Sequence, residues 1–271
     1  VQIKMGITEL YTNAAIQYSQ AMMFGAGDME ALMTAVQMEG SVRGAIGRGP
    51  DQAHPFTPHQ VVDMLASQLA AGAGWQKIRP RLAVDIRSCI VSATFLKLGK
   101  RSEEGIKELT RGLDILCIAR KKLDPASNYS DRGHTLRPSF ERGVRVFLLD
   151  MMIEVEGQHR NPRVILEEAK KVTDSYEAEY AEEMGNGHRS LSTLDPIFDI
   201  ALMGDAYAAE ALCFRDLALQ QPVDMFNSKP GSRIHFYRLC SNAYIKAVEL
   251  SLEGSDDEFG WCVVHYALLG G

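Results

Sequence analysis

The residues with the most suggestive chemistry are two carboxylate and histidine pairs. Glu156 and His159 have a Glu-x-x-His spacing, which places both side chains on one face of a helix, as in di-iron helical bundles. A complete site of that kind needs a second copy. The only similar spacing, Asp51 with His54, lies in a stretch rich in glycine and proline, and the other histidines show no ligand spacing. We therefore predict no metal ion and no other cofactor.

Paired carboxylates offer a second kind of chemistry. Asp150 and Glu154 lie four residues apart in an apolar helical stretch, so their side chains point the same way. Two like charges raise each other's pKa, as in an acid/base pair, but Arg142 and Arg145 are near enough in sequence to neutralise them. We favour a structural ion network over an acid/base pair.

Motifs for nucleophilic catalysis and nucleotide binding are missing from the sequence. It contains no Gly-x-Ser-x-Gly, no His-Glu-x-x-His, no phosphate-binding loop and no dinucleotide fingerprint. We therefore name no catalytic residue, and an enzyme is the less favoured interpretation.

Composition and charge narrow the class of protein further. With 46% hydrophobic and 24% charged residues, the 271-residue chain is typical of globular proteins. Its net charge of −6 disfavours nucleic acid as a partner. The five cysteines are widely spaced and odd in number, which indicates free thiols in a reducing compartment. No apolar stretch reaches the roughly 20 residues of a membrane span, so we expect a cytoplasmic protein, with a nuclear location left open.

Apolar residues recur at three- and four-residue steps, which is typical of an all-α protein. Cap residues followed by proline at Thr57-Pro58, Asn161-Pro162 and Asp195-Pro196 mark helix starts, and glycines mark their ends. The expected helices span 5–23, 28–46, 58–71, 79–98, 103–122, 138–156, 162–184, 196–220, 232–252 and 259–269. We read residues 1–271 as one helical domain, with N-terminal helices in 1–80 and hairpins in 81–271. Because the chain starts at Val1, it is open whether it is part of a longer protein.

Two stretches resemble tetratricopeptide repeats, in which small residues let two antiparallel helices approach closely. The first stretch matches at Phe95, Leu98-Gly99, Gly105-Ile106, Leu109 and Gly112-Leu113; the second matches at 203–207 and 244–250. The hairpins recur about every 55 residues, whereas a standard repeat has roughly 34. The resemblance implies antiparallel hairpins stacked as a right-handed tetratricopeptide-like array with long helices.

The same resemblance implies a groove that binds a peptide or helix of another protein. Its groove-facing residues would be Cys89, Ala93, Lys97, Ala201, Asp205 and Ala209. Of these six residues only Lys97 and Asp205 are polar. Grooves that bind the C-terminal carboxylate of a peptide usually carry several basic or amide side chains, so we do not expect this groove to bind one. The leading hypothesis is a protein-interaction scaffold that presents a groove or an edge helix to a partner, and self-association is also open.

Three further interpretations stay open beside the scaffold. A basic patch of Arg132, Arg137, Arg142 and Arg145 would contact an acidic peptide or a phosphate, or would merely pair with the acidic helix that follows. An all-α enzyme for a small apolar or isoprenoid-like substrate would hold a divalent metal with Asp150, Glu154, Asp199 and Asp205. A scaffold region cut from a larger regulatory protein is the third.

Overall fold

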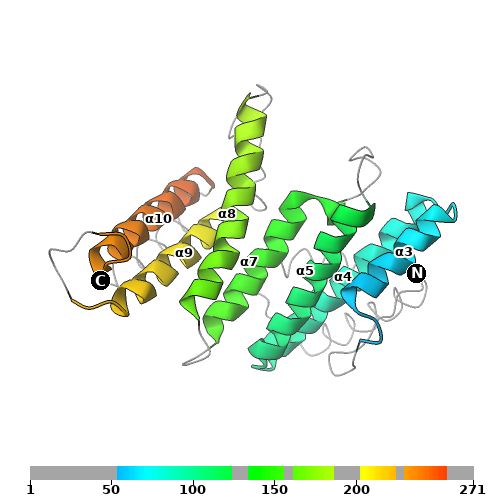
Figure 1. Ribbon diagram of the computed structural model, residues 1–271, viewed down its shortest axis with the longest axis horizontal. Helices are drawn as coiled ribbons and strands as arrows, with labels where there is room; N and C mark the ends of the chain where they lie inside the picture. The colour runs from blue at the N-terminus through cyan, green and yellow to red at the C-terminus, as the bar shows by residue number, and fades with distance from the viewer. Residues whose placement is uncertain (1–53, 124–133, 156–160, 186–201, 224–228, 255–271) are drawn as a thin grey trace. The chain divides into compact units, whose positions relative to one another are not determined.

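The computed structural model describes residues 54–123, 134–155, 161–185, 202–223 and 229–254. In these residues there are seven α-helices, one short 3₁₀ helix and no strand, so this part of the chain is all-α as predicted (Figure 1). The elements are α3 (Pro58–Ala70), α4 (Trp75–Leu98), α5 (Ser102–Leu123), η1 (His134–Leu136), α7 (Pro138–Glu154), α8 (Pro162–Gly185), α9 (Leu202–Leu219) and α10 (Arg233–Gly254).

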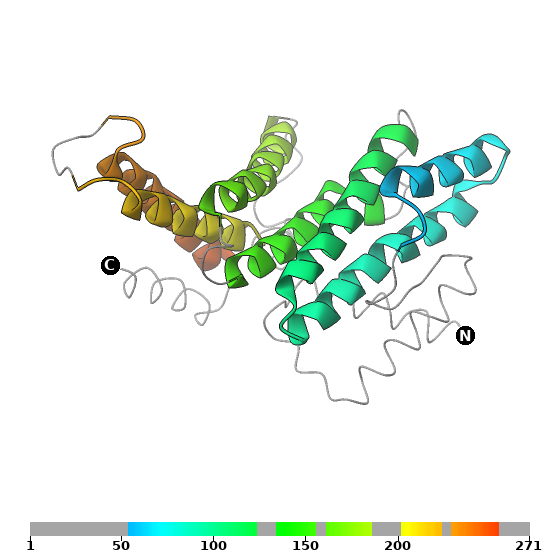
Figure 2. The same ribbon diagram turned by 60° about the horizontal axis from the view of Figure 1, so that its bottom comes forward.

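The chain divides into two compact units, Val1–Met151 and Met152–Gly271. In unit 1, α4 packs along α5, and α3 contacts both of these helices (Figure 2). In unit 2, α9 packs against both α8 and α10. Helices that are neighbours in the sequence are therefore neighbours in space within each unit. A single array over all 271 residues stays a prediction.

Two helix starts follow the predicted cap-then-proline pattern. At α3, the Thr57 hydroxyl accepts a bond from the backbone N–H of Gln60, whose side chain accepts from the N–H of Thr57 in return. At α8, the Asn161 side chain accepts from the N–H of Arg163. Pro58 and Pro162 each occupy the first helical position, where the N–H that proline lacks would have no helical partner. Local sequence alone therefore determines where these helices begin.

Helix α4 begins at Trp75, four residues before the expected start at residue 79. Pro80 therefore lies inside the helix and not in its first turn. A proline there removes one backbone hydrogen bond. Burial of Ile78 and Leu82 explains why the first turn forms despite that loss.

The turns after α3 and α4 have the same hydrogen-bond pattern but different residues. In each turn, two N–H groups beyond the helix bond back to carbonyls of its last turn: to Leu69 and Gln68 after α3, and to Lys97 and Leu96 after α4. This pattern needs a left-handed residue just after the helix cap. That residue is Gly72, with φ +90°, in the first turn but Lys100, with φ +57°, in the second. The predicted stop at Gly99 is therefore correct in position, but Lys100 carries the left-handed conformation.

Glycines on α5 allow α4 and α7 to approach it closely. A Cβ atom at Gly112 would lie 3.1 Å from the Cβ of Cys89 on α4. A Cβ atom at Gly105 would lie 3.2 Å from the carbonyl oxygen of Ala93 and would clash with the side chain of Met151 on α7. Both glycines thus confirm the prediction that small residues let α4 and α5 approach each other closely.

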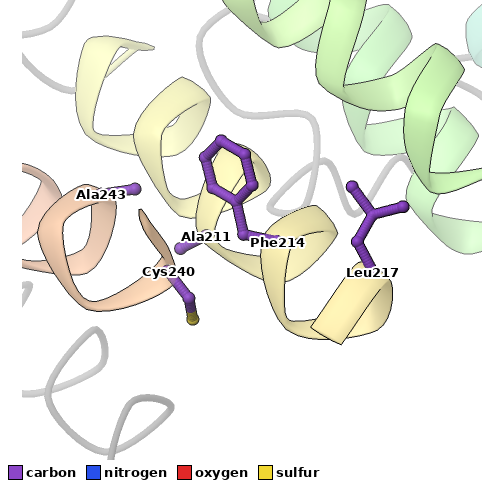
Figure 3. Close-up of a cluster of buried hydrophobic side chains, with 5 residues drawn as sticks. All are labelled: Ala211, Phe214, Leu217, Cys240 and Ala243. Atoms are coloured by element: carbon purple, nitrogen blue, oxygen red, sulfur yellow. The ribbon is translucent and has the colours of Figure 1, made fainter. Parts of the chain in front are cut away.

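Unit 2 has an apolar core between α9 and α10. Ala211, Phe214 and Leu217 of α9 form one cluster with Cys240 and Ala243 of α10, and all five are buried (Figure 3). Three of the five are small, and Phe214 supplies the largest side chain of the five.

Several predicted elements lie outside the described residues. These are the helices expected at 5–23, 28–46 and 259–269, the start of the helix expected at 196–220, and most of the loop after α5. Among the described residues, no helix is both long and apolar enough to cross a membrane.

Candidate functional site

Unit 1 contains a small cavity between the segment before α3 and the helices α3, α4 and α5. Its volume is about 20 Å³, which is room for about one water molecule. An organic ligand needs roughly 300 Å³ or more. The cavity is therefore suited to water or an ion and is too small for an isoprenoid-like substrate. It is lined by His54, Pro55, Phe56, Val61, Met64, Leu65, Arg81, Asp85, Ser88, Cys89, Arg111 and Ile115.

Three side chains with metal-binding chemistry meet beside this cavity. His54 precedes α3, Cys89 lies on α4 and Glu108 lies on α5, and one ligand atom from each lies within 4.8 Å of the other two. The Nε2 atom of His54 is 2.9 Å and 3.2 Å from the two carboxylate oxygens of Glu108. These residues are 35 and 19 positions apart along the chain (89 − 54 and 108 − 89), so only the helix packing brings them together.

The thiol of Cys89 is shielded from solvent, with 1% of the residue exposed. Burial raises its pKa to about 12, and the nearby Glu108 carboxylate also acts in that direction. The guanidinium of Arg111 opposes both effects and hydrogen-bonds the thiol. At neutral pH the thiol is therefore protonated and not a nucleophile.

Arg111 also fixes the segment that carries His54. Its Nη2 atom donates a 2.7 Å hydrogen bond to the backbone carbonyl of Phe56. Two residues on α5, Arg111 and Glu108, thus hold the chain on either side of Pro55. The position of His54 is set by contacts and not by α3 itself, because the segment precedes the Thr57 cap.

A separate ion network joins α4, α5 and α7. Lys97 bonds Asp150 at 2.5 Å, and Glu141 pairs with both Arg120 and Arg145. Burial raises the pKa of Glu141, but the two guanidiniums outweigh that effect and hold the pKa below its usual range. Each of these charges has a partner of opposite sign, and the desolvation that such pairs cost decides how much they stabilise the packing.

The predicted groove residues are mostly covered by other parts of the chain. Cys89, Ala93 and Ala209 are buried, and the Lys97 ammonium is engaged by Asp150. Asp205 is exposed, and Ala201 lies outside the described residues. The groove therefore stays a prediction.

The arginines of the predicted basic patch do not share one environment. Arg137 is exposed, Arg142 is buried and Arg145 pairs with Glu141. Arg132 lies outside the described residues. The described members thus include one open cation, Arg137, and the patch as an anion-binding surface stays a prediction.

The carboxylates named for the enzyme alternative are likewise dispersed. Asp150 pairs with Lys97 in unit 1, whereas Asp205 is an exposed residue of unit 2. Glu154 is exposed on the last turn of α7, and Asp199 lies outside the described residues. The Glu156 and His159 pair also lies outside them.

Unit 2 has polar contacts both near its surface and in its interior. The hydroxyl of Tyr207 donates to Glu177 at 2.5 Å, and Lys246 bonds the same carboxylate at 2.9 Å. The Tyr207 hydrogen bond and then the Lys246 contact lower the pKa of Glu177. Deeper in the unit, Thr173 donates to Glu210 at 2.7 Å, and burial raises the pKa of that carboxyl.

Helix α10 exposes large side chains on a part of its surface that is distinct from its contact with α9. Tyr237 is 38% exposed and Ile245 is 55% exposed, while Arg238 between them is also exposed. Tyr237 and Ile245 are two helical turns, or about 12 Å, apart. We call Tyr237, Arg238 and Ile245 the α10 edge.

The sequence prediction missed the cluster of His54, Cys89 and Glu108. His54 was considered only with Asp51, a near neighbour in sequence, and Cys89 only as a free thiol and a groove residue. No spacing rule links three residues from a loop and two helices. The available signal was the predicted hairpin itself, because a glycine at position 112 places Cys89 against α5.

Comparisons of the chain with protein-family models, with curated proteins and with solved structures each found no match.

Proposed function

We propose that the protein is a helical-hairpin scaffold that binds a partner protein through the α10 edge. The observation that carries the proposal is the exposure of Tyr237 and Ile245 on a helix whose opposite face is buried against α9. Large apolar and aromatic side chains on an open helix face are typical of protein-binding surfaces.

The hairpin packing supports a scaffold more than it supports an enzyme. Consecutive helices pack against each other in both units, and the close approach at Gly105 and Gly112 is the feature on which the tetratricopeptide resemblance rests. In our proposal these hairpins stack as a right-handed array. The cavity of unit 1 has room for about one water molecule, which disfavours a buried organic substrate.

The chemistry of the α10 edge indicates the kind of partner. Arg238 lies between Tyr237 and Ile245 in sequence, and Arg233 lies over the ring of Tyr237 at 5.8 Å from its centroid. A complementary segment would place apolar side chains on Tyr237 and Ile245 and a carboxylate near the guanidiniums. We therefore expect an amphipathic partner segment with acidic residues.

Site-specific photocrosslinking in cells tests this proposal. A benzophenone amino acid is placed at Ile245 and, as a control, at Asn242, which is exposed on the same helix. We expect a discrete adduct with another protein from position 245, a much weaker one from position 242, and loss of the adduct when Tyr237→Asp is added. Equal labelling from both positions, or an adduct containing only a second copy of this chain, would contradict the proposal.

A further inference from the structure

We propose that His54, Cys89 and Glu108 form a zinc site in unit 1, with a water molecule from the adjoining cavity as the fourth ligand. The site is independent of the α10 edge, because its three residues and its cavity lie in unit 1.

The three donors match the chemistry of zinc. Imidazole nitrogen, thiolate sulfur and carboxylate oxygen are its usual protein ligands, and three protein ligands with one open position form a common arrangement. Magnesium and calcium prefer sets made of oxygen alone. A sulfur ligand therefore selects zinc or a similar transition metal over these harder cations.

The distances need only a small adjustment. Zinc bonds of about 2.0 to 2.3 Å in a tetrahedron separate ligand atoms by roughly 3.3 to 3.7 Å. The His54 and Glu108 atoms are already 2.9 Å apart, and the three ligand atoms lie within 4.8 Å of one another. A shift of about 1 Å by the Cys89 side chain brings the set to bonding distance.

The surroundings supply the fourth ligand and balance the charge. The cavity of about 20 Å³ holds one water molecule, and the buried Nε atom of Arg111, which has no hydrogen-bond partner among the described residues, is a donor for such a water. Zinc displaces the thiol proton of Cys89 to solvent. The thiolate and the Glu108 carboxylate then cancel the charge of the ion, so that the site adds no net charge to a pocket that already holds Asp85 and Arg111.

The simpler alternative is an ion pair of His54 and Glu108 with Cys89 as an ordinary buried thiol. The two interpretations differ in whether sulfur takes part. In the zinc site, the ion ties the segment before α3 to both α4 and α5, whereas the ion pair ties it to α5 only.

Metal titration of the full chain separates these interpretations. The protein is stripped with a chelator and titrated with Zn²⁺ against a chromophoric competitor, and Co²⁺ is used in parallel because a thiolate ligand produces a sulfur-to-cobalt charge-transfer band. The variants Cys89→Ser, His54→Asn and Glu108→Gln are compared with two matched controls, Cys117→Ser on α5 and His59→Asn on α3. Far-UV circular dichroism checks folding, and His54→Asn lies outside the helices, so that at least this variant leaves them intact.

We expect one tightly bound Zn²⁺ per chain and a charge-transfer band with Co²⁺. Each of the three ligand variants should weaken Zn²⁺ binding by at least about tenfold, and Cys89→Ser should abolish the band. Both controls should match the parent protein. Absence of tight binding in the parent, or binding that His54→Asn leaves unchanged, would overturn the proposal.

Discussion

The two units bury their polar groups differently, although both are built from hairpins of neighbouring helices. Unit 1 places an imidazole, a thiol, a carboxylate and a guanidinium around an internal cavity. Unit 2 packs apolar side chains of α8, α9 and α10 together, with a buried hydrogen bond between Thr173 and Glu210 and an exposed ion pair between Glu177 and Lys246. Helical hairpins therefore carry a cluster of polar side chains inside unit 1 and the exposed α10 edge in unit 2.

The packing contacts explain this difference. On α5, glycines let the α4 backbone approach closely, which brings Cys89 of α4 next to residues of α5. In unit 2, alanines line the contact and one phenylalanine ring fills it. Close backbone approach gathers side chains from different helices, whereas a large ring fills the interface with apolar volume.

We expect the largest loss of stability from a substitution in the apolar core of unit 2. Phe214→Ala removes the largest side chain of the buried cluster and should lower the stability of unit 2 by about 3 to 5 kcal/mol. Leu219→Ala, on the same helix but 56% exposed, is the matched control and should change stability by less than about 0.5 kcal/mol. Native-state hydrogen exchange, read from peptides of α9 and α10, measures both. Similar losses for the two variants would show that Phe214 does not carry the core.

We expect the second-largest loss of stability from a substitution where α4 and α5 approach each other closely in unit 1. Gly112→Val inserts a branched side chain where a Cβ atom would already lie 3.1 Å from that of Cys89, and overpacking of this kind costs about 1 to 3 kcal/mol. Gly74→Ser is the control, since a Cβ atom there meets nothing within 4 Å and serine is a good helix cap. Hydrogen exchange in α4 and α5 should rise for Gly112→Val only. Unchanged protection in that variant would contradict the close packing.

Substitutions in the turns that end α3 and α4 should change the stability of unit 1 by less, and in opposite directions. Lys100→Gly should stabilise unit 1 by about 1 kcal/mol, because a left-handed conformation costs a lysine more than a glycine. Gly72→Ala should destabilise it by a similar amount for the same reason. Thermal unfolding of the full chain should therefore move in opposite directions for the two variants. A shift in the same direction would mean that backbone conformation does not govern these turns.

The surface network of unit 2 should show the smallest effect. Tyr207→Phe removes the hydrogen bond that most lowers the pKa of Glu177, so that this pKa should rise towards its ordinary value. Because the folded pKa is lowered, Glu177 contributes stability above its unfolded pKa and loses it as the pH falls through the folded value. NMR titration of the carboxyl group measures the shift, and an unchanged pKa would show that Lys246 alone sets it.

Helix positions were largely predictable from sequence, because caps and periodicity are local signals. Thr57-Pro58 and Asn161-Pro162 identify two helix starts for reasons that need no tertiary contact. The start of α4 was wrong because burial of Ile78 and Leu82 outweighs the cost of Pro80, which lies between them. Local signals cannot report that kind of competition.

The candidate site was not predictable in the same way. His54 and Glu108 are 54 residues apart, and no spacing motif links one to the other. The helical hairpin could be predicted, but which side chains meet across it depends on how far α4 slides along α5. That register follows from the contacts of Gly105 and Gly112 with α4, and such contacts are visible only in three dimensions.

The contrast between an internal ion site in unit 1 and an outward surface in unit 2 is tested most directly by hydrogen exchange of the full chain with and without Zn²⁺. Zinc should increase protection in the segment before α3 and in the parts of α4 and α5 near Cys89 and Glu108, while α9 and α10 stay unchanged. Unchanged exchange in unit 1, or an equal change in both units, would contradict the site and the contrast built on it.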